Sequence, residues 1–301
     1  MCAHKDGYVP HGTIKPQDSW LRIAGHLAVW AVAYAVGVAV VLGAFLDRPI
    51  GGLGLVYVML CGHGGYVLDR VKFRDVDLDP ADLMAEPGRH GYLRRRAGWL
   101  RILMVVEWVG AAAVGAVISP VLGGVVLGGV LAGYLYSGWR PGKVSRLKDV
   151  AGLKAGLVSC AVVGLGLFAV LGESIGAGFG WVGGLDWVAV GGVVLVVCGD
   201  AVVCDLDDRE SDGAYLTRSV PVSIGSRGAK IVAAVLLVLG SVVLAAWSPA
   251  DQVRMRALFG GLIAVSGIGI MRRPTSYGLG GRRDWIDGRM LVVALVVVLV
   301  G

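Results

Sequence analysis

The amino-acid sequence predicts an all-α polytopic membrane protein. Hydrophobic residues make up 56% of its 301 residues and charged residues only 17%, and the mean hydropathy is +0.72. The apolar residues fall in uninterrupted blocks of about 20, the length at which an α-helix crosses the hydrocarbon core of a bilayer. The strand-like alternation of a membrane β-barrel is absent. We therefore predict nine transmembrane helices, at residues 23–46, 50–68, 98–118, 121–139, 151–172, 187–206, 229–247, 257–271 and 290–301.

The positions of the basic residues predict the orientation of these helices. With nine helices, the N-terminus and every second loop lie on the same side of the membrane. All Lys and Arg residues fall in the N-terminal segment or in and beside those loops, except Arg48, Arg254 and Arg256. Because cytoplasmic loops carry an excess of Lys and Arg, we expect the N-terminus and the long loops to be cytoplasmic, in a multi-pass protein of the cytoplasmic membrane.

The chain is expected to consist of a polar cytoplasmic tail, residues 1–19, and a membrane domain, residues 20–301. The tail lacks the pattern of a secretory signal peptide. The net charge of +6 follows from the asymmetry across the membrane, so the lipid bilayer is an expected partner and nucleic acid is not. The five cysteines have no paired spacing, which argues against a disulfide framework or a zinc site.

The stretch CDLDDRESDG, residues 204–213, places five acidic residues directly after the apolar sixth segment. On one continuous helix, Asp205, Asp208 and Asp212 stand at positions i, i+3 and i+7 and share a face, while Asp207 points roughly the opposite way. Three like charges on one face repel each other, and at a helix C-terminus they also oppose the helix dipole. The face is therefore solvated, paired with nearby Arg and Lys, or occupied by a divalent metal ion.

A second group of acidic residues, from Asp69 to Glu86, follows the second apolar segment, and Asp69 closes that segment. Pro80 breaks the interior of a helix but fits a first turn, so we expect a new short helix here with Asp79 as its cap. Asp75 and Asp79 are further candidate ligands. Mg²⁺ prefers carboxylate oxygens and commonly bridges to substrate phosphates. Two such clusters among Arg and Lys residues therefore suit a diphosphate–Mg²⁺ complex.

Three stretches resemble motifs of the UbiA-type intramembrane prenyltransferases. CDLDDRESDGAYLTRSVPVSIG, residues 204–225, resembles the second aspartate-rich motif of that family, a D-x-x-D-x-x-x-D run followed by a proline and a glycine. YLYSGWRPGKVSRLKDVAGLKA, residues 134–155, resembles its Y-S-x-P…R-L-K segment. YVLDR at 66–70, with PGRHGYLRR at 87–95, resembles the first-motif region and its tail. The matching positions of the first two stretches are Asp205, Asp208, Asp212, Pro221, Gly225, Tyr136, Ser137, Arg146 and Lys148.

The first aspartate motif departs from the family pattern, which is usually N-D-x-x-D-x-x-x-D. Asp69 stands in the place of the asparagine, Arg70 in that of the first aspartate, and Phe73 in that of the next. The resemblance implies nine helices bundled around a central cavity, with two Mg²⁺-binding aspartate motifs at its cytoplasmic end. Of these motifs, only the second has all its aspartates in this sequence, although Ser219 stands in the place of its threonine and Leu216 in that of a glycine.

The resemblance implies a Mg²⁺-dependent prenyltransferase that transfers an isoprenyl group from an allylic diphosphate to a lipophilic acceptor, aromatic or lipid. The allylic cation would form in an apolar cavity from which water is excluded. The implied metal ligands are Asp205, Asp208 and Asp212 for one ion, and Asp69 with Asp75 or Asp79 for the other. The expected catalytic residues are Asp69, Asp208 and Asp212, and the expected diphosphate contacts are Lys148, Arg146 and Arg89, because cations stabilise the leaving group. The expected cavity residues are Tyr66 and Tyr136, whose rings can stabilise positive charge, and His63, a polar residue within the second apolar segment.

Two other functions stay open on the sequence alone. The altered first motif also suits a terpene cyclase of the same fold, which ionises the same substrate and captures the cation internally. A transporter would couple cations through its acidic residues, but such sites lie near the membrane midplane and these clusters lie at helix ends. Glu107 and Asp200 are acidic residues within apolar segments, where burial is costly, and a packing hydrogen bond is expected for Asp200.

Overall fold

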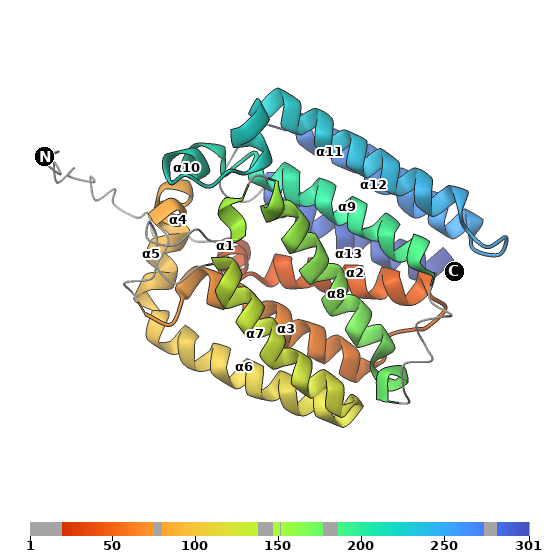
Figure 1. The fold of residues 1–301 in the computed structure, drawn as a ribbon, viewed down its shortest axis with the longest axis horizontal. Helices are drawn as coiled ribbons and strands as arrows, with labels where there is room; N and C mark the ends of the chain where they lie inside the picture. Colours follow the sequence, from red (N-terminus) through yellow and green to blue (C-terminus); the bar gives the residue numbers. More distant parts are fainter. Residues whose placement is uncertain are drawn as a thin grey trace, which may run out of the picture.

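The computed structural model describes residues 20–74, 80–137, 147–150, 152–176, 186–273 and 282–300. Over these residues the regular secondary structure is helical throughout (Figure 1). The helices are α1 (Trp20–His26), α2 (Val29–Phe45), α3 (Gly52–Val71), α4 (Pro80–Ala85), α5 (Pro87–Arg95), α6 (Ala97–Ile118), α7 (Pro120–Ser137), a 3₁₀ turn (Leu147–Asp149), α8 (Leu153–Gly176), α9 (Trp187–Asp205), α10 (Arg209–Ala214), α11 (Val220–Ala246), α12 (Val253–Met271) and α13 (Arg282–Val300).

Each predicted apolar segment coincides with a long helix of the described chain, but three boundaries differ. The first segment is divided into α1 and α2, because Ala28 adopts a left-handed conformation (φ 60°) that interrupts a right-handed helix. Helix α11 begins at Val220 and α13 at Arg282, well before the apolar residues that predicted them. Both helices begin with turns that contain polar residues, which a search for apolar blocks does not detect.

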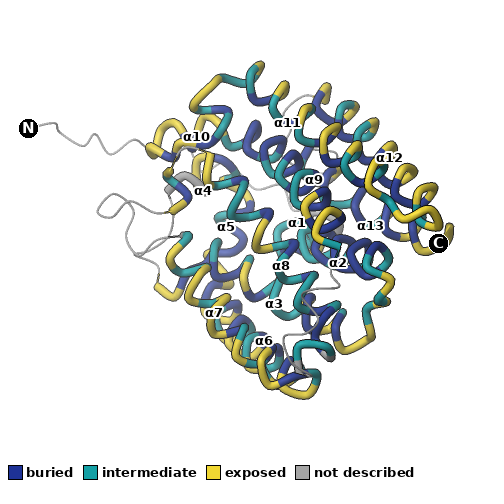
Figure 2. Tube along the Cα trace, turned by 45° about the vertical axis from the view of Figure 1, so that its right-hand side comes forward, coloured by how far each residue is buried: buried dark blue, intermediate teal, exposed yellow. Residues whose placement is uncertain are grey.

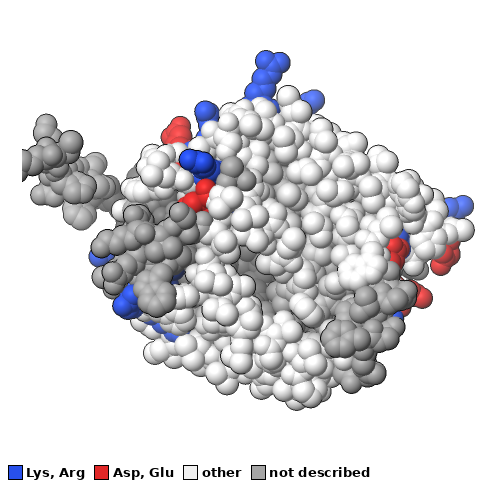
Figure 3. All heavy atoms as spheres, in the orientation of Figure 1, with Lys and Arg blue, Asp and Glu red and all other residues white. Residues whose placement is uncertain are grey.

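Within the described residues, five helices are long and apolar enough to cross a membrane: α6, α8, α9, α11 and α12. The shorter α2 and α7 are also apolar. Figure 3 shows charged side chains near the end where α4, α5 and α10 lie and at the opposite end, with a broad uncharged surface between them. Large apolar side chains such as Val117, Leu127 and Leu299 are 73–84% exposed, which suits contact with lipid. That all nine long helices cross the membrane stays a prediction.

Three hydrophobic clusters hold the described helices together, and one of them joins α3 to α5 and α6. Of the other two, one joins α2, α8 and α9 to α11, α12 and α13, and the other joins α2 and α8 to α3, α6 and α7. Figure 2 shows the buried residues on the inward sides of these helices and the exposed residues on the outer turns. Helices α9 and α11 lie side by side, and an added Cβ at Gly240 would lie only 2.8 Å from the carbonyl oxygen of Gly192. Glycine therefore permits this close approach of two helix backbones.

Two buried charges tie distant helices together. Asp200 of α9 accepts a hydrogen bond of 2.8 Å from the Tyr34 hydroxyl of α2, which confirms the expected packing hydrogen bond, and it also forms an ion pair with Arg289 of α13. Arg256 of α12 is only 1% exposed and pairs with Asp186 at 2.7 Å. These contacts satisfy charges that would otherwise be costly inside an apolar bundle.

Candidate active site

A cavity of about 1410 Å³ lies inside the bundle, with a wall formed mainly by α2, α3, α7, α8 and α9. Most of the lining residues are apolar or glycine. The acidic residues that line it are Asp69, Glu86, Asp200, Asp205, Asp207, Asp208, Asp212 and Asp287. The Lys and Arg residues that line it are Arg70, Arg89, Arg95, Lys148, Lys154 and Arg283. Both predicted acidic groups therefore face the same cavity, at the ends of α3 and α9.

The segment after the sixth apolar block is not the continuous helix that the spacing argument assumed. Helix α9 ends at Asp205 and α10 begins at Arg209. Between them, the amide of Leu206 donates to the Val203 carbonyl at 3.3 Å and the amide of Asp207 donates to the Cys204 carbonyl at 3.1 Å. These bonds span three residues instead of four, so the last turn tightens and the helix ends.

The three carboxylates converge nevertheless, because Lys154 of α8 lies among them. Its ammonium nitrogen is 2.9 Å from Asp205 Oδ1, 2.9 Å from Asp212 Oδ2 and 3.8 Å from Asp208 Oδ2. We call Asp205, Asp208 and Asp212 the aspartate cluster. Asp205 Oδ2 is buried without a hydrogen-bond partner among the described residues. The cluster thus already surrounds a positive charge and retains one unused acceptor.

Asp207 makes a separate contact, as its position in the sequence predicted. Its Oδ1 lies 2.7 Å from Nη1 of Arg282, and both side chains are buried. Burial raises the pKa of Asp207, an effect that Arg282 opposes. Asp207 therefore contributes mainly to the attachment of α13 to the end of α9.

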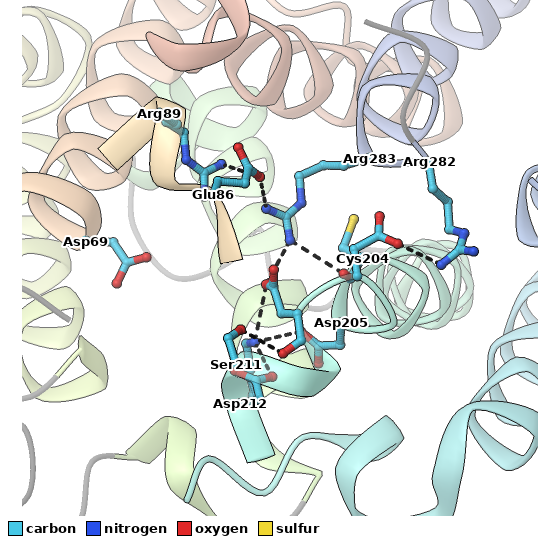
Figure 4. A network of polar contacts seen from close by, with 12 residues as sticks. Asp69, Glu86, Arg89, Cys204, Asp205, Ser211, Asp212, Arg282 and Arg283 are labelled. Carbon is cyan, nitrogen blue, oxygen red and sulfur yellow. Dashed lines mark hydrogen bonds and ion pairs between the residues drawn. The ribbon is translucent and has the colours of Figure 1, made fainter. Parts of the chain in front are cut away.

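A chain of ion pairs extends from the aspartate cluster to α5. Arg283 Nη2 donates to Asp208 Oδ2 at 2.8 Å, and Arg283 Nη1 donates to Glu86 Oε1 at 3.3 Å. Arg89 Nη1 lies 3.1 Å from the same oxygen of Glu86 (Figure 4). Although burial favours the neutral acid, the Arg283 guanidinium and the Lys154 ammonium hold the pKa of Asp208 below its usual range.

The first acidic group is only partly described. Asp69 pairs with Lys72 at 3.1 Å and lies 3.6 Å from Arg70, which stands in the place of the family's first aspartate. Pro80 begins α4, which confirms the short helix predicted there. Asp75, Asp79 and Arg146 lie outside the described residues. Lys148 and Arg89, expected as diphosphate contacts, both line the cavity.

Of the three expected cavity residues, Tyr66 and Tyr136 line the cavity, and the Arg70 guanidinium lies 5.6 Å from the centre of the Tyr66 ring. His63 is not among the described lining residues. Its Nδ1 lies 2.6 Å from Glu107 Oε1 of α6, and its Nε2 lies 3.0 Å from the carbonyl of Leu27. His63 precedes Asp69 by six residues, which is not a whole number of turns at about 3.6 residues per turn, so the two side chains leave different faces of α3.

Three residues of this network were missed by the sequence reasoning: Lys154, Glu86 and Arg283. The two cations share a signal that could have revealed them. Each lies in the first turn of a helix, where the helix dipole disfavours positive charge. Such a placement indicates that a carboxylate or another anion lies nearby. Glu86 carries no comparable signal.

No protein-family model matches the sequence, and no curated protein matches it. Solved structures do match. A UbiA homologue from Archaeoglobus fulgidus bound to DMAPP and Mg²⁺ has a TM-score of 0.58 at 17% identity, covering 92% of this chain and 99% of that one. The same comparison with a UbiA homologue from Aeropyrum pernix K1 gives a TM-score of 0.62 at 13% identity, covering 89% and 97%. The chain has the UbiA fold.

A further structure with the UbiA fold, of an Archaeoglobus fulgidus homologue bound to GPP and Mg²⁺, has a TM-score of 0.61 at 18% identity and covers 91% of this chain and 96% of that one. The UbiA fold predicted from the motifs is thus confirmed over nearly the whole chain. The identities of 13–18% are too low to carry over the activity of these proteins, which has to be argued from the cavity itself.

The donor atoms of the aspartate cluster suit the Mg²⁺ that the UbiA fold implies. Carboxylate oxygens are the ligands this ion prefers, and Asp205 Oδ2 is buried without a partner in the described structure. In the described residues, no group of three or more Asp, Glu, His or Cys side chains is arranged to hold a metal. The three carboxylates of the cluster are arranged around the Lys154 ammonium instead. The cluster therefore fits Mg²⁺ in donor type and in its affinity for positive charge, and Lys154 would have to share it.

Proposed function

We propose that this chain is a UbiA-type prenyltransferase, which binds an isoprenyl diphosphate with Mg²⁺ and transfers the prenyl group to a lipophilic acceptor. One observation carries the proposal: the aspartate cluster and several cationic side chains meet at one part of a cavity that is otherwise largely apolar. An amphiphilic diphosphate has the same division of charged head and apolar tail. The UbiA homologues solved with DMAPP or GPP and Mg²⁺ support this proposal.

The charged end of the cavity suits the departure of diphosphate. When the allylic C–O bond breaks, its electron pair leaves with the diphosphate, and Lys148 and Arg89 provide positive charge that stabilises it. Mg²⁺, when bound, supplies further positive charge to the leaving group, and the aspartate cluster with Asp69 would hold it. These residues favour the separated charges of the transition state over the intact substrate.

The apolar wall suits the second half of the reaction. It excludes water, which would otherwise capture the allylic cation and give an alcohol. The ring of Tyr136 lines the cavity and can stabilise a positive charge near its face. The acceptor then attacks the allylic carbon and loses a proton. We place this site at the cytoplasmic side of a multi-pass membrane protein, on the basis of the charge asymmetry in the sequence.

The proposal is tested by incubating membranes that contain the protein with radiolabelled geranyl diphosphate and Mg²⁺, with and without a lipid extract as acceptor. We expect Mg²⁺-dependent release of inorganic diphosphate, which Asp208→Asn and Asp212→Asn reduce at least 100-fold. Asp207→Asn is the matched control, because its carboxylate pairs with Arg282, and it should retain most of the release per folded molecule.

Two outcomes would change the assignment. Absence of diphosphate release with allylic diphosphates of five to twenty carbons would refute both the transferase and the cyclase. Release that needs no acceptor and yields a hydrocarbon or an alcohol would instead establish a terpene cyclase of the UbiA fold.

A further inference from the structure

Two adjacent arginines at the start of α13 project to different partners. Arg282 pairs with Asp207 and does not line the cavity, whereas Arg283 lines it and pairs with Asp208 and Glu86 (Figure 4). Positive charge in the first turn of a helix is disfavoured by the dipole, by about 0.3–1 kcal/mol per charge. The position of Arg282 is explained by its buried ion pair. Arg283 also forms ion pairs, with Asp208 and Glu86, but its side chain is 21% exposed and lines the cavity, so it can bind a ligand there as well.

The contacts of Glu86 indicate which kind of ligand Arg283 would bind. A single oxygen, Glu86 Oε1, lies between two guanidinium groups, 3.3 Å from Arg283 Nη1 and 3.1 Å from Arg89 Nη1. We call Arg89 and Arg283 the arginine pair. A phosphate oxygen bound by two arginines has this same environment, and guanidinium groups are well suited to bind phosphate.

The arginine pair also has donors to spare. Arg89 is only 6% exposed, and its Nη2 is buried with no hydrogen-bond partner among the described residues. A buried guanidinium donor without a partner is costly, and an anion in the cavity would satisfy it. Glu86 offers this donor no oxygen in the structure described here.

In the described structure, ion pairs hold the Glu86 side chain between the arginines, and no capping hydrogen bond adds to them. Glu86 is the N-cap residue of α5, yet its side chain makes no capping hydrogen bond. Its side chain is 19% exposed, so the carboxylate can turn toward water without being buried elsewhere. A diphosphate carries more negative charge than one carboxylate and has more acceptor oxygens.

We propose that Arg283 is a further diphosphate-binding residue, and that Glu86 occupies the phosphate position of the arginine pair until substrate displaces it. This inference rests on the proposed function. Helix α13 thereby contributes to a site to which the sequence motifs assign residues of α3, α5, the 3₁₀ turn, α9 and α10. Glu86 lowers the affinity for diphosphate, since the substrate has to compete with it.

The test is equilibrium binding of geranyl S-thiolodiphosphate, an unreactive analogue, to the purified full-length protein in detergent with Mg²⁺. Arg283→Gln should raise the Kd by roughly 10- to 100-fold, as expected for the loss of hydrogen bonds to a charged group. Arg282→Gln is the matched control, one residue away on the same helix, and its Kd should equal that of the wild type. Glu86→Gln should lower the Kd by about 3- to 10-fold, because a neutral amide competes less well for the arginine pair.

The Glu86 variant makes the result independent of folding, since a misfolded protein does not bind more tightly. Wild-type affinity in Arg283→Gln, or weaker binding in Glu86→Gln, would overturn the inference while leaving the proposed function intact. Absence of binding by the wild-type protein would refute the proposed function and this inference with it.

Discussion

Replacement of Lys154 by methionine removes an ammonium group that lies within 4 Å of all three carboxylates of the aspartate cluster. Methionine has a similar length and keeps the apolar contacts of the side-chain stem. The ammonium lies 2.9 Å from both Asp205 and Asp212 and 3.8 Å from Asp208, and the Lys154 side chain is only 15% exposed. The substitution therefore leaves three carboxylates close together, with Arg283 as the remaining described partner of Asp208.

The expected cost is large because the carboxylates are buried. At an effective dielectric constant of about 20, an ammonium and a carboxylate about 3 Å apart attract each other by roughly 5–6 kcal/mol before desolvation is counted. Measured losses on removal of one partner from a buried ion pair are about 3–5 kcal/mol. We expect the free energy of unfolding of Lys154→Met to fall by about this amount in metal-free buffer.

On the proposed function, Mg²⁺ should reverse much of this loss, since an ion held by the folded cluster stabilises the folded state over the unfolded chain. A ligand present at 100 times its Kd stabilises a protein by about 2.7 kcal/mol. The assay is thermal unfolding of the protein in detergent, with EDTA or with Mg²⁺, and the exposed Lys230→Met is the control substitution. If Lys154→Met unfolds at the wild-type temperature in EDTA, or if Mg²⁺ raises both proteins equally, the cluster is not held by charge in the way described.

Three further predictions follow from other contacts. Asp200→Ala should cost about 3–5 kcal/mol by leaving Arg289 unpaired, and combining it with Arg289→Met should cost less than the sum of the two, by about 0.5–3 kcal/mol in a double-mutant cycle of chemical unfolding. Gly240→Ala should destabilise by about 1–3 kcal/mol, because its Cβ would lie 2.8 Å from a carbonyl of α9, whereas Gly261→Ala, with open space around it, should be neutral or slightly stabilising in the same measurement. Asp69→Asn should reduce diphosphate release at least 100-fold with a small change in thermal stability, since its side chain is 29% exposed; wild-type release would remove Asp69 from the site.

Much of the fold was predictable because a membrane imposes long apolar segments with charged ends. The convergence of Asp205, Asp208 and Asp212 was also predictable, even though α9 ends before α10 begins, because a tight turn preserves most of the angular relation between nearby residues. Local periodicity therefore described the aspartate cluster well, and placed Asp207 apart from it.

The partners of that cluster were not predictable in the same way. Lys154, Glu86 and Arg283 are far apart in the sequence and join one network only when α5, α8, α9 and α13 pack together. No local sequence pattern predicts that these residues come together. His63, by contrast, has a direction that local spacing predicts: it leaves α3 on a different face from Asp69, and its contact with Glu107 of α6 accounts for its burial.

Two of the three basic residues that are predicted to lie on the far side of the membrane are held in contacts between helices. Arg48 donates to the Ser174 hydroxyl at 2.9 Å, and Arg256 pairs with Asp186 and donates to the carbonyl of Phe45. An arginine bound in this way has its charge satisfied within the protein and does not interact freely with lipid headgroups. On the predicted orientation, the far surface thus presents less mobile positive charge than its count of basic residues suggests. Topology predictions for distant relatives should improve when basic residues with acidic partners in short loops are given less weight.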